Sequence, residues 1–126
     1  VIISGLVGRP VQGFRKAIIY DDEIATGGSV LELSRILIEQ GLQEIWVACT
    51  HGVFVHGGLE KLAAVPQITG IVTTDTIYIP PEKRHPKLHQ LSVAPVFGDA
   101  IRRNYLRESI GDLFIYGDES PDNPEQ

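Results

Sequence analysis

Several kinds of residue are scarce in this 126-residue chain, and each scarcity argues against a class of protein. A single cysteine cannot form an internal disulfide, so the sequence favours a reducing, cytoplasmic compartment. No apolar run approaches the roughly 20 residues of a transmembrane helix, which predicts that the chain has no membrane span. The 11 basic residues are outnumbered by 16 acidic ones. The resulting net charge of −5 argues against a nucleic-acid partner, because phosphate backbones bind basic surfaces.

Methionine is absent, and the chain starts directly with the strand-like Val1-Ile2-Ile3. We therefore interpret the sequence as part of a longer protein. Most of the negative charge lies in residues 117–126, which hold four acidic residues and no basic one: Asp118, Glu119, Asp122 and Glu125. The rest of the chain is nearly neutral, and 43% hydrophobic residues suffice for a core. We predict one domain over residues 1–116, incomplete on its N-terminal side, and a mobile acidic tail over 117–126.

Short apolar runs alternate with helical periodicity along the chain. The pattern predicts strands at 17–20, 44–50, 68–73 and 88–94, helices at 29–40, 59–65 and 95–106, and a proline-containing loop at 78–87. This alternation is typical of an α/β fold with a mainly parallel sheet and flanking helices. Within that sheet we expect Trp46 and Cys49 to belong to the core.

The segment from residue 17 to residue 29 combines three features that together indicate a ligand site. An apolar strand leads to Asp21-Asp22, and Thr26-Gly27-Gly28-Ser29 then runs into a helix. Backbone N–H groups and hydroxyls beside a helix N-terminus bind anions, whereas carboxylates repel a bare phosphate and accept hydrogen bonds from hydroxyls. A sugar phosphate satisfies both halves. No lysine follows the glycines, which excludes a Walker A loop, and a turn that only caps the helix is the structural alternative.

Residues 17–29 resemble the phosphoribosyl-pyrophosphate loop of type I phosphoribosyltransferase folds. Five later blocks then follow in order, at residues 48–54, 74–77, 91–95, 99–103 and 108–114. With these blocks, the chain resembles the C-terminal part of the ribose-phosphate pyrophosphokinases, or PRPP synthetases, from about Gly5 to Phe114.

The resemblance implies a Mg²⁺-dependent, homo-oligomeric enzyme. It would transfer the pyrophosphoryl group of ATP to the 1-hydroxyl of ribose 5-phosphate and so form phosphoribosyl pyrophosphate (PRPP). By the same resemblance, Asp21 and Asp22 would hold ribose hydroxyls. The 5-phosphate would be wrapped by Ala25, Thr26, Gly27, Gly28 and Ser29. No catalytic residue or metal ligand is assigned within this chain, because the family's Mg²⁺ ligands fall mostly outside it.

Two departures from the family keep other functions open. Ala25 stands where many members have an aspartate, and the family's ATP-binding domain is absent from the 126 residues. We therefore expect the segment alone to be inactive. One alternative is a phosphoribosyltransferase that consumes PRPP with a nucleobase. The other is a non-catalytic homologue of the PRPP synthetases that binds pentose phosphates or has a regulatory role.

Two further groups of polar residues indicate a ligand site less strongly than residues 17–29 do. His51 follows the C-terminal end of a predicted strand, where open α/β sheets bind ligands, which makes residues 50–52 a second candidate. Lys83, Arg84 and Lys87 form a basic loop, which we interpret as solvated surface.

Overall fold

A computed structural model describes residues 11 and 13–113 of the chain. These residues belong to two compact units, Val1–Ser92 and Val93–Gln126, and each unit is described by itself. The predicted domain end at residue 116 and the acidic tail over 117–126 lie outside the described residues, so both stay predictions.

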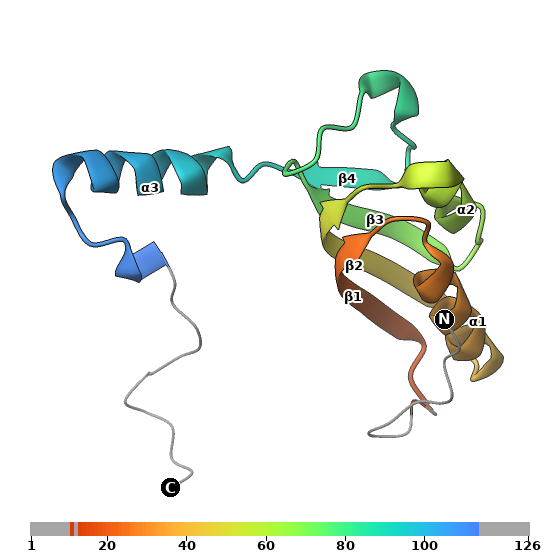
Figure 1. The fold of residues 1–126 in the computed structure, drawn as a ribbon. Coiled ribbons are helices and arrows are strands. Elements are labelled where there is room, and N and C mark those ends of the chain that lie inside the picture. Colours follow the sequence, from red (N-terminus) through yellow and green to blue (C-terminus); the bar gives the residue numbers. More distant parts are fainter. Residues whose placement is uncertain (1–10, 12, 114–126) are drawn as a thin grey trace, which may run out of the picture. The chain divides into compact units, whose positions relative to one another are not determined.

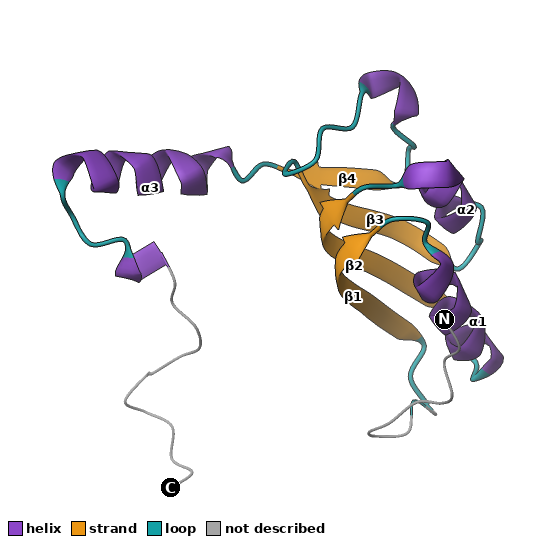
Figure 2. Ribbon diagram, viewed as in Figure 1, coloured by secondary structure: helices purple, strands orange, loops and turns teal. Residues whose placement is uncertain are grey.

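The first unit is a four-stranded sheet with two helices (Figures 1 and 2). Its strands are β1 (Lys16–Ile24), β2 (Glu44–Gly52), β3 (Ile68–Thr74) and β4 (Leu88–Leu91). They lie side by side in chain order and all neighbouring pairs are parallel. The helices α1 (Gly28–Glu39) and α2 (Gly58–Ala63) connect the first three strands. The predicted α/β class with a parallel sheet is confirmed.

The core lies between the sheet and these two helices. Alternate residues of β2 point to opposite faces, so Ile45, Val47 and Cys49 share one face and are all buried. Leu37 of α1 and Leu62 of α2 belong to the same buried cluster. The helices therefore cover the face that carries these residues, and the predicted core position of Cys49 is confirmed.

Trp46 lies on the other face of the sheet, which corrects the prediction that it belongs to the core. Its ring is partly buried and stacks on His89, with 5.7 Å between ring centroids. Gly70 makes room for it, because a Cβ there would come 2.2 Å from the indole ring. On the same face, Ile18 is 75% exposed and Tyr20 is 73% exposed. Among the described residues of the first unit, no helix covers this face.

Lys87 connects β4 to the end of α2, which corrects its interpretation as a solvated loop residue. Its Nζ donates hydrogen bonds to the carbonyl oxygens of Ala63 at 2.8 Å and Val65 at 3.1 Å. These carbonyls lie at and just beyond the last turn of α2, where intrahelical partners are missing. A cation placed there also interacts favourably with the helix dipole.

The second unit contains α3 (Ala94–Leu106), with Pro95 in its first turn as predicted. The predicted strand at 88–94 is too long: β4 ends at Leu91, which pairs with Thr74, the last residue of β3. Without a paired neighbour, the ladder stops there. Along α3, Arg103 and Arg102 donate hydrogen bonds to the Asp99 carboxylate, and these bonds lower the pKa of Asp99.

Candidate functional site

The carboxylates of the candidate site are positioned by the last third of β1. This strand continues through the acidic residues to Ile24, with Glu23 paired to His51 and Ile24 to Gly52 of β2. Because side chains alternate along a strand, Asp21 and Glu23 share one face of the sheet and Asp22 lies on the other. The two adjacent aspartates therefore do not point to the same place.

Next to these carboxylates is a turn that leaves the start of α1 without a side-chain cap. Gly27 precedes the helix with φ +76°, a conformation that glycine adopts without the steric cost of a side chain. Its carbonyl oxygen accepts the hydrogen bond from the Leu31 N–H at 2.9 Å. No side chain caps the N-terminus of α1, and its first turn contains no acidic residue. The free N–H groups and the positive end of the helix dipole together favour an anion at this point.

The turn rests on the first turn of α2 and on the loop that follows β2. The carbonyl oxygen of Ile24 accepts hydrogen bonds from the N–H groups of Val53 at 3.1 Å and Phe54 at 3.0 Å. Gly58 is packed so closely that an added Cβ would come 2.6 Å from the Ala25 carbonyl oxygen. The turn is therefore held by backbone contacts, which leaves the exposed Thr26, Gly28 and Ser29 free to meet a ligand.

A hollow of about 170 Å³ joins the carboxylates to the turn. It is lined by Asp21, Glu23, Ile24, Ala25, Thr26, Gly27, Gly28, Ser29 and Val30. Six of the seven residues assigned from the sequence are thus brought together, and Asp22 is the one that does not line the hollow. Glu23 was missed. Its place in the hollow depends on the pairing of β1 with β2 as far as Ile24, which puts Glu23 on the face of Asp21.

Gly27 is buried, and its missing side chain faces the protein. A Cβ on Gly27 would come 3.2 Å from Cγ of Leu62 and 3.4 Å from the carbonyl oxygen of Gly58. A side chain at position 27 would therefore crowd α2 and would also be strained by the positive φ.

Residues 50–52, the second candidate, do not line this hollow. His51 Nδ1 lies 2.8 Å from Oγ1 of Thr76, in the loop after β3. Thr76 and Thr74 also donate hydrogen bonds to the carbonyl oxygen of Thr50, at 3.1 and 2.7 Å. These bonds join the carboxyl ends of β2 and β3 and hold the edge of the sheet next to the candidate site.

Cys49 lies beneath the site without taking part in it. Burial raises the pKa of its thiol, and the negative charge of Asp21 adds to the rise, while a hydrogen bond between Sγ and the Thr73 hydroxyl opposes it. The thiol is therefore neutral at physiological pH. Within residues 11 and 13–113, no three His, Cys, Asp or Glu side chains cluster as metal ligands. In the same part of the chain, none of the helices has the length and apolar character needed to cross a membrane.

Comparison with known proteins shows which family the chain belongs to. Residues 5–115 match the model of the phosphoribosyl synthetase-associated domain. The chain belongs to this family. The chain is 44% identical over 109 residues to a ribose-phosphate pyrophosphokinase of Rhodopirellula baltica, a match that covers 86% of this chain and 34% of the relative. A ribose-phosphate pyrophosphokinase of Bacillus cereus is 39% identical over 112 residues, covering 89% of this chain and 34% of the relative.

A solved structure shows the same fold. The crystal structure of phosphoribosylpyrophosphate synthetase from Mycobacterium smegmatis matches with a TM-score of 0.73 and 32% identity, over 79% of this chain and 33% of that one. The resemblance to ribose-phosphate pyrophosphokinases that the sequence motifs predict is thus confirmed. The chain spans about a third of the length of the relatives it matches.

Proposed function

We propose that this chain supplies the ribose 5-phosphate site of a ribose-phosphate diphosphokinase. The enzyme would transfer the pyrophosphoryl group of ATP to the 1-hydroxyl of ribose 5-phosphate. In that reaction the 1-oxygen bonds to the β-phosphorus of ATP, the bond from that phosphorus to the α-phosphate oxygen breaks, and AMP leaves. The relatives named ribose-phosphate pyrophosphokinase support this activity.

The observation that carries the proposal is the two-ended character of the hollow. At one end, the uncapped N-terminus of α1 and the hydroxyls of Thr26 and Ser29 are suited to a phosphate. At the other end, the carboxylates of Asp21 and Glu23 are suited to sugar hydroxyls. A pentose phosphate presents these two kinds of group on one small molecule.

In this site the chain's residues would act by binding and orientation. Phosphoryl transfer depends mainly on positioning and on neutralising charge, and little covalent chemistry is required of the protein. With the phosphate held at α1, the pentose extends toward β1, and the carboxylates fix its hydroxyls. Ala25 supplies no carboxylate next to the pentose, so Asp21 and Glu23 are the groups that this chain provides.

The hollow offers two carboxylates, which are too few to hold Mg²⁺ alone, so the ion would be shared between this chain and the substrates. Mg²⁺ is usually bound by one or two carboxylates together with substrate oxygens and water. Asp21 and Glu23 would provide the carboxylates on this chain, and substrate oxygens would complete the shell. When bound, Mg²⁺ supplies neutralisation of phosphate charge.

The remaining expectations are ATP as second substrate, a homo-oligomer, a cytoplasmic location and no nucleic-acid partner. The exposed Ile18 and Tyr20 on β1 support association, because parallel sheets are usually covered on both faces. The sequence predicts that the 126 residues alone are inactive, and this stays a prediction.

The test is an assay of AMP formation from ATP and ribose 5-phosphate, made on the longest natural chain that contains this segment. We expect AMP to form only when both substrates are present, and we expect Ser29→Ala to raise the KM for ribose 5-phosphate more than the KM for ATP. Pyrophosphate release that requires PRPP and a nucleobase would instead identify a phosphoribosyltransferase. Ribose 5-phosphate binding without either reaction would identify the regulatory alternative.

A further inference from the structure

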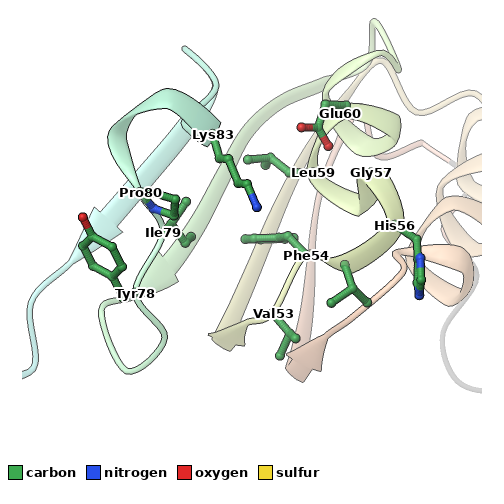
Figure 3. A pocket seen from close by; sticks show the side chains of 11 residues that line it. Val53, Phe54, His56, Gly57, Leu59, Glu60, Tyr78, Ile79, Pro80 and Lys83 are labelled. Atoms are coloured by element: carbon green, nitrogen blue, oxygen red, sulfur yellow. The ribbon is translucent and has the colours of Figure 1, made fainter.

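A second cavity, of about 480 Å³, lies in the first unit and shares no lining residue with the hollow of the candidate site (Figure 3). It is formed by the loop after β2, the first turn of α2 and the loop after β3. Its lining consists of Val53, Phe54, Val55, His56, Gly57, Leu59, Glu60, Tyr78, Ile79, Pro80 and Lys83. Its volume is within the range of small-molecule sites, and the carboxyl ends of parallel strands are where such sites occur.

The inner wall of the cavity is apolar and preformed. Leu59 is 2% exposed and Ile79 is 6% exposed, so both present a fixed apolar surface. The Phe54 ring occupies the space beside Gly52, where an added Cβ would come 2.4 Å from the ring. An aromatic wall of this kind is held in place by packing and needs no ligand to order it.

The loop that carries this wall is under backbone strain. Phe54 has φ 44° and His56 has φ 53°, both in the left-handed region that residues with side chains seldom adopt. Such conformations persist where the surrounding structure imposes them, and they cluster at ligand-binding segments. In this conformation the Phe54 ring lies beside Gly52, on the side of the cavity opposite Ile79 (Figure 3).

Two opposite charges line the cavity without a partner. The ammonium group of Lys83 points into it, and the Glu60 carboxylate lies on the α2 side (Figure 3). Within the described part of the chain, neither side chain forms an ion pair or a hydrogen bond. The cavity thus offers one cationic donor and one anionic acceptor above an apolar wall. A polyphosphate does not match this set, because Glu60 would repel it.

We propose that this cavity binds a planar heteroaromatic ring of the nucleobase type. The faces of such a ring are apolar and stack on aromatic side chains, which matches the Phe54 ring in the wall of the cavity. Its edge carries both acceptors and donors, which match Lys83 and Glu60 respectively. This site goes beyond the proposed function and does not depend on it, since it shares no residue with the ribose 5-phosphate hollow.

The experiment is an NMR titration of the ¹⁵N-labelled 126-residue chain with adenine. We expect saturable shifts of the amide signals of Phe54, Leu59 and Ile79, and none at residues 26–29. Adenosine and AMP present the same ring, so they are titrated in parallel, and we expect affinities within a few-fold of adenine. Binding of AMP without binding of adenine or adenosine would overturn the proposal, because phosphate would then be the recognised group.

Matched variants separate the cavity from general surface charge. Lys83→Ala and Glu60→Ala should each weaken adenine binding by about tenfold or more, since each removes a hydrogen bond to a charged group. Lys61→Ala and Glu82→Ala alter exposed charges that do not line the cavity, and should leave the affinity unchanged. Wild-type affinity in both cavity variants, or the absence of saturable shifts at millimolar adenine, would overturn the assignment. Titration with ribose 5-phosphate in the same samples keeps this result distinct from that of the proposed function.

Discussion

The carbonyl oxygen of Ala25 lies so close to Gly58 that it leaves no room for a side chain there. An added Cβ at Gly58 would come 2.6 Å from that oxygen and 3.1 Å from the carbonyl carbon of Thr26. Both neighbours are backbone atoms, which cannot rotate away as a side chain can. The turn of the candidate site and the start of α2 are therefore fitted to each other, although 33 positions separate Ala25 from Gly58 in the sequence.

Gly58→Ala should consequently displace the turn. We expect a loss of about 1–3 kcal/mol in the free energy of unfolding, the usual cost of overpacking. Weaker binding of ribose 5-phosphate should accompany it. Urea denaturation and calorimetry measure the two effects. Gly98→Ala is the matched control: no atom lies within 4 Å of the added Cβ, and alanine favours the helix there. Equal stability of Gly58→Ala and the wild type would contradict the packing described here.

The two neighbouring aspartates should behave differently when they are neutralised. Asp21→Asn removes a carboxylate that lines the hollow, and a hydrogen bond to a charged group contributes ~1.5–3 kcal/mol. We expect ribose 5-phosphate affinity to fall about tenfold to a hundredfold, while sulfate binding is unchanged or improves. Asp22→Asn, on the opposite face of β1, should have the smaller effect. A larger loss for Asp22→Asn would show that the pentose approaches the other face of the sheet.

Removal of the Lys87 ammonium group should loosen the end of α2. Lys87→Met keeps most of the aliphatic stem and eliminates the hydrogen bonds to the carbonyl oxygens of Ala63 and Val65. We expect a loss of about 1–3 kcal/mol in the free energy of unfolding, measured in urea. Lys61→Met is the control on the same helix, and an exposed substitution of this kind usually changes stability by less than about 0.5 kcal/mol. If the two variants unfold at the same urea concentration, Lys87 has no structural role.

The buried Cys49 thiol should resist alkylation in the folded chain. Its pKa is raised by burial, so the reactive thiolate is scarce at neutral pH, and the side chain is only 5% exposed. Since the thiol holds its proton to a higher pH in the folded than in the unfolded state, its contribution to stability decreases as pH rises above the ordinary thiol value. Iodoacetamide labelling across pH 7–10, followed by mass spectrometry, should be slow until the chain unfolds in urea. Rapid labelling of the native chain at pH 7 would refute this account.

Much of the fold could be predicted from the sequence, because the apolar periodicity that defines each element is local. Helix α1, for example, ends near Gly41, which adopts φ +97° as a glycine after a helix often does. The position of Trp46 was not predictable in this way. It depends on Gly70 of the neighbouring strand, and nothing in the residues around Trp46 carries that information.

The candidate site was predictable in composition and less so in orientation. The glycines and hydroxyls of the turn are recognisable from their order, and the structure gathers them at the start of α1. The aspartates were expected to follow the end of a strand at Tyr20. In fact β1 continues to Ile24 because β2 pairs with it as far as Gly52, and this continuation places Asp21 with Glu23 instead of with Asp22. Strand length is set by the partner, so it could not be inferred from β1 alone.

The central claim, that residues 25–29 bind the phosphate of a pentose phosphate, is tested most directly by mapping ribose 5-phosphate binding on the ¹⁵N-labelled chain. We predict saturable shifts of the amide signals of Thr26, Gly28 and Ser29, smaller shifts of the same signals with inorganic phosphate, and no response to ribose. Thr26→Ala together with Ser29→Ala should weaken binding by about tenfold or more, because the hydroxyl donors to an anion are lost. Saturable binding that leaves residues 25–29 unshifted, or no binding of ribose 5-phosphate by the folded chain, would contradict the claim.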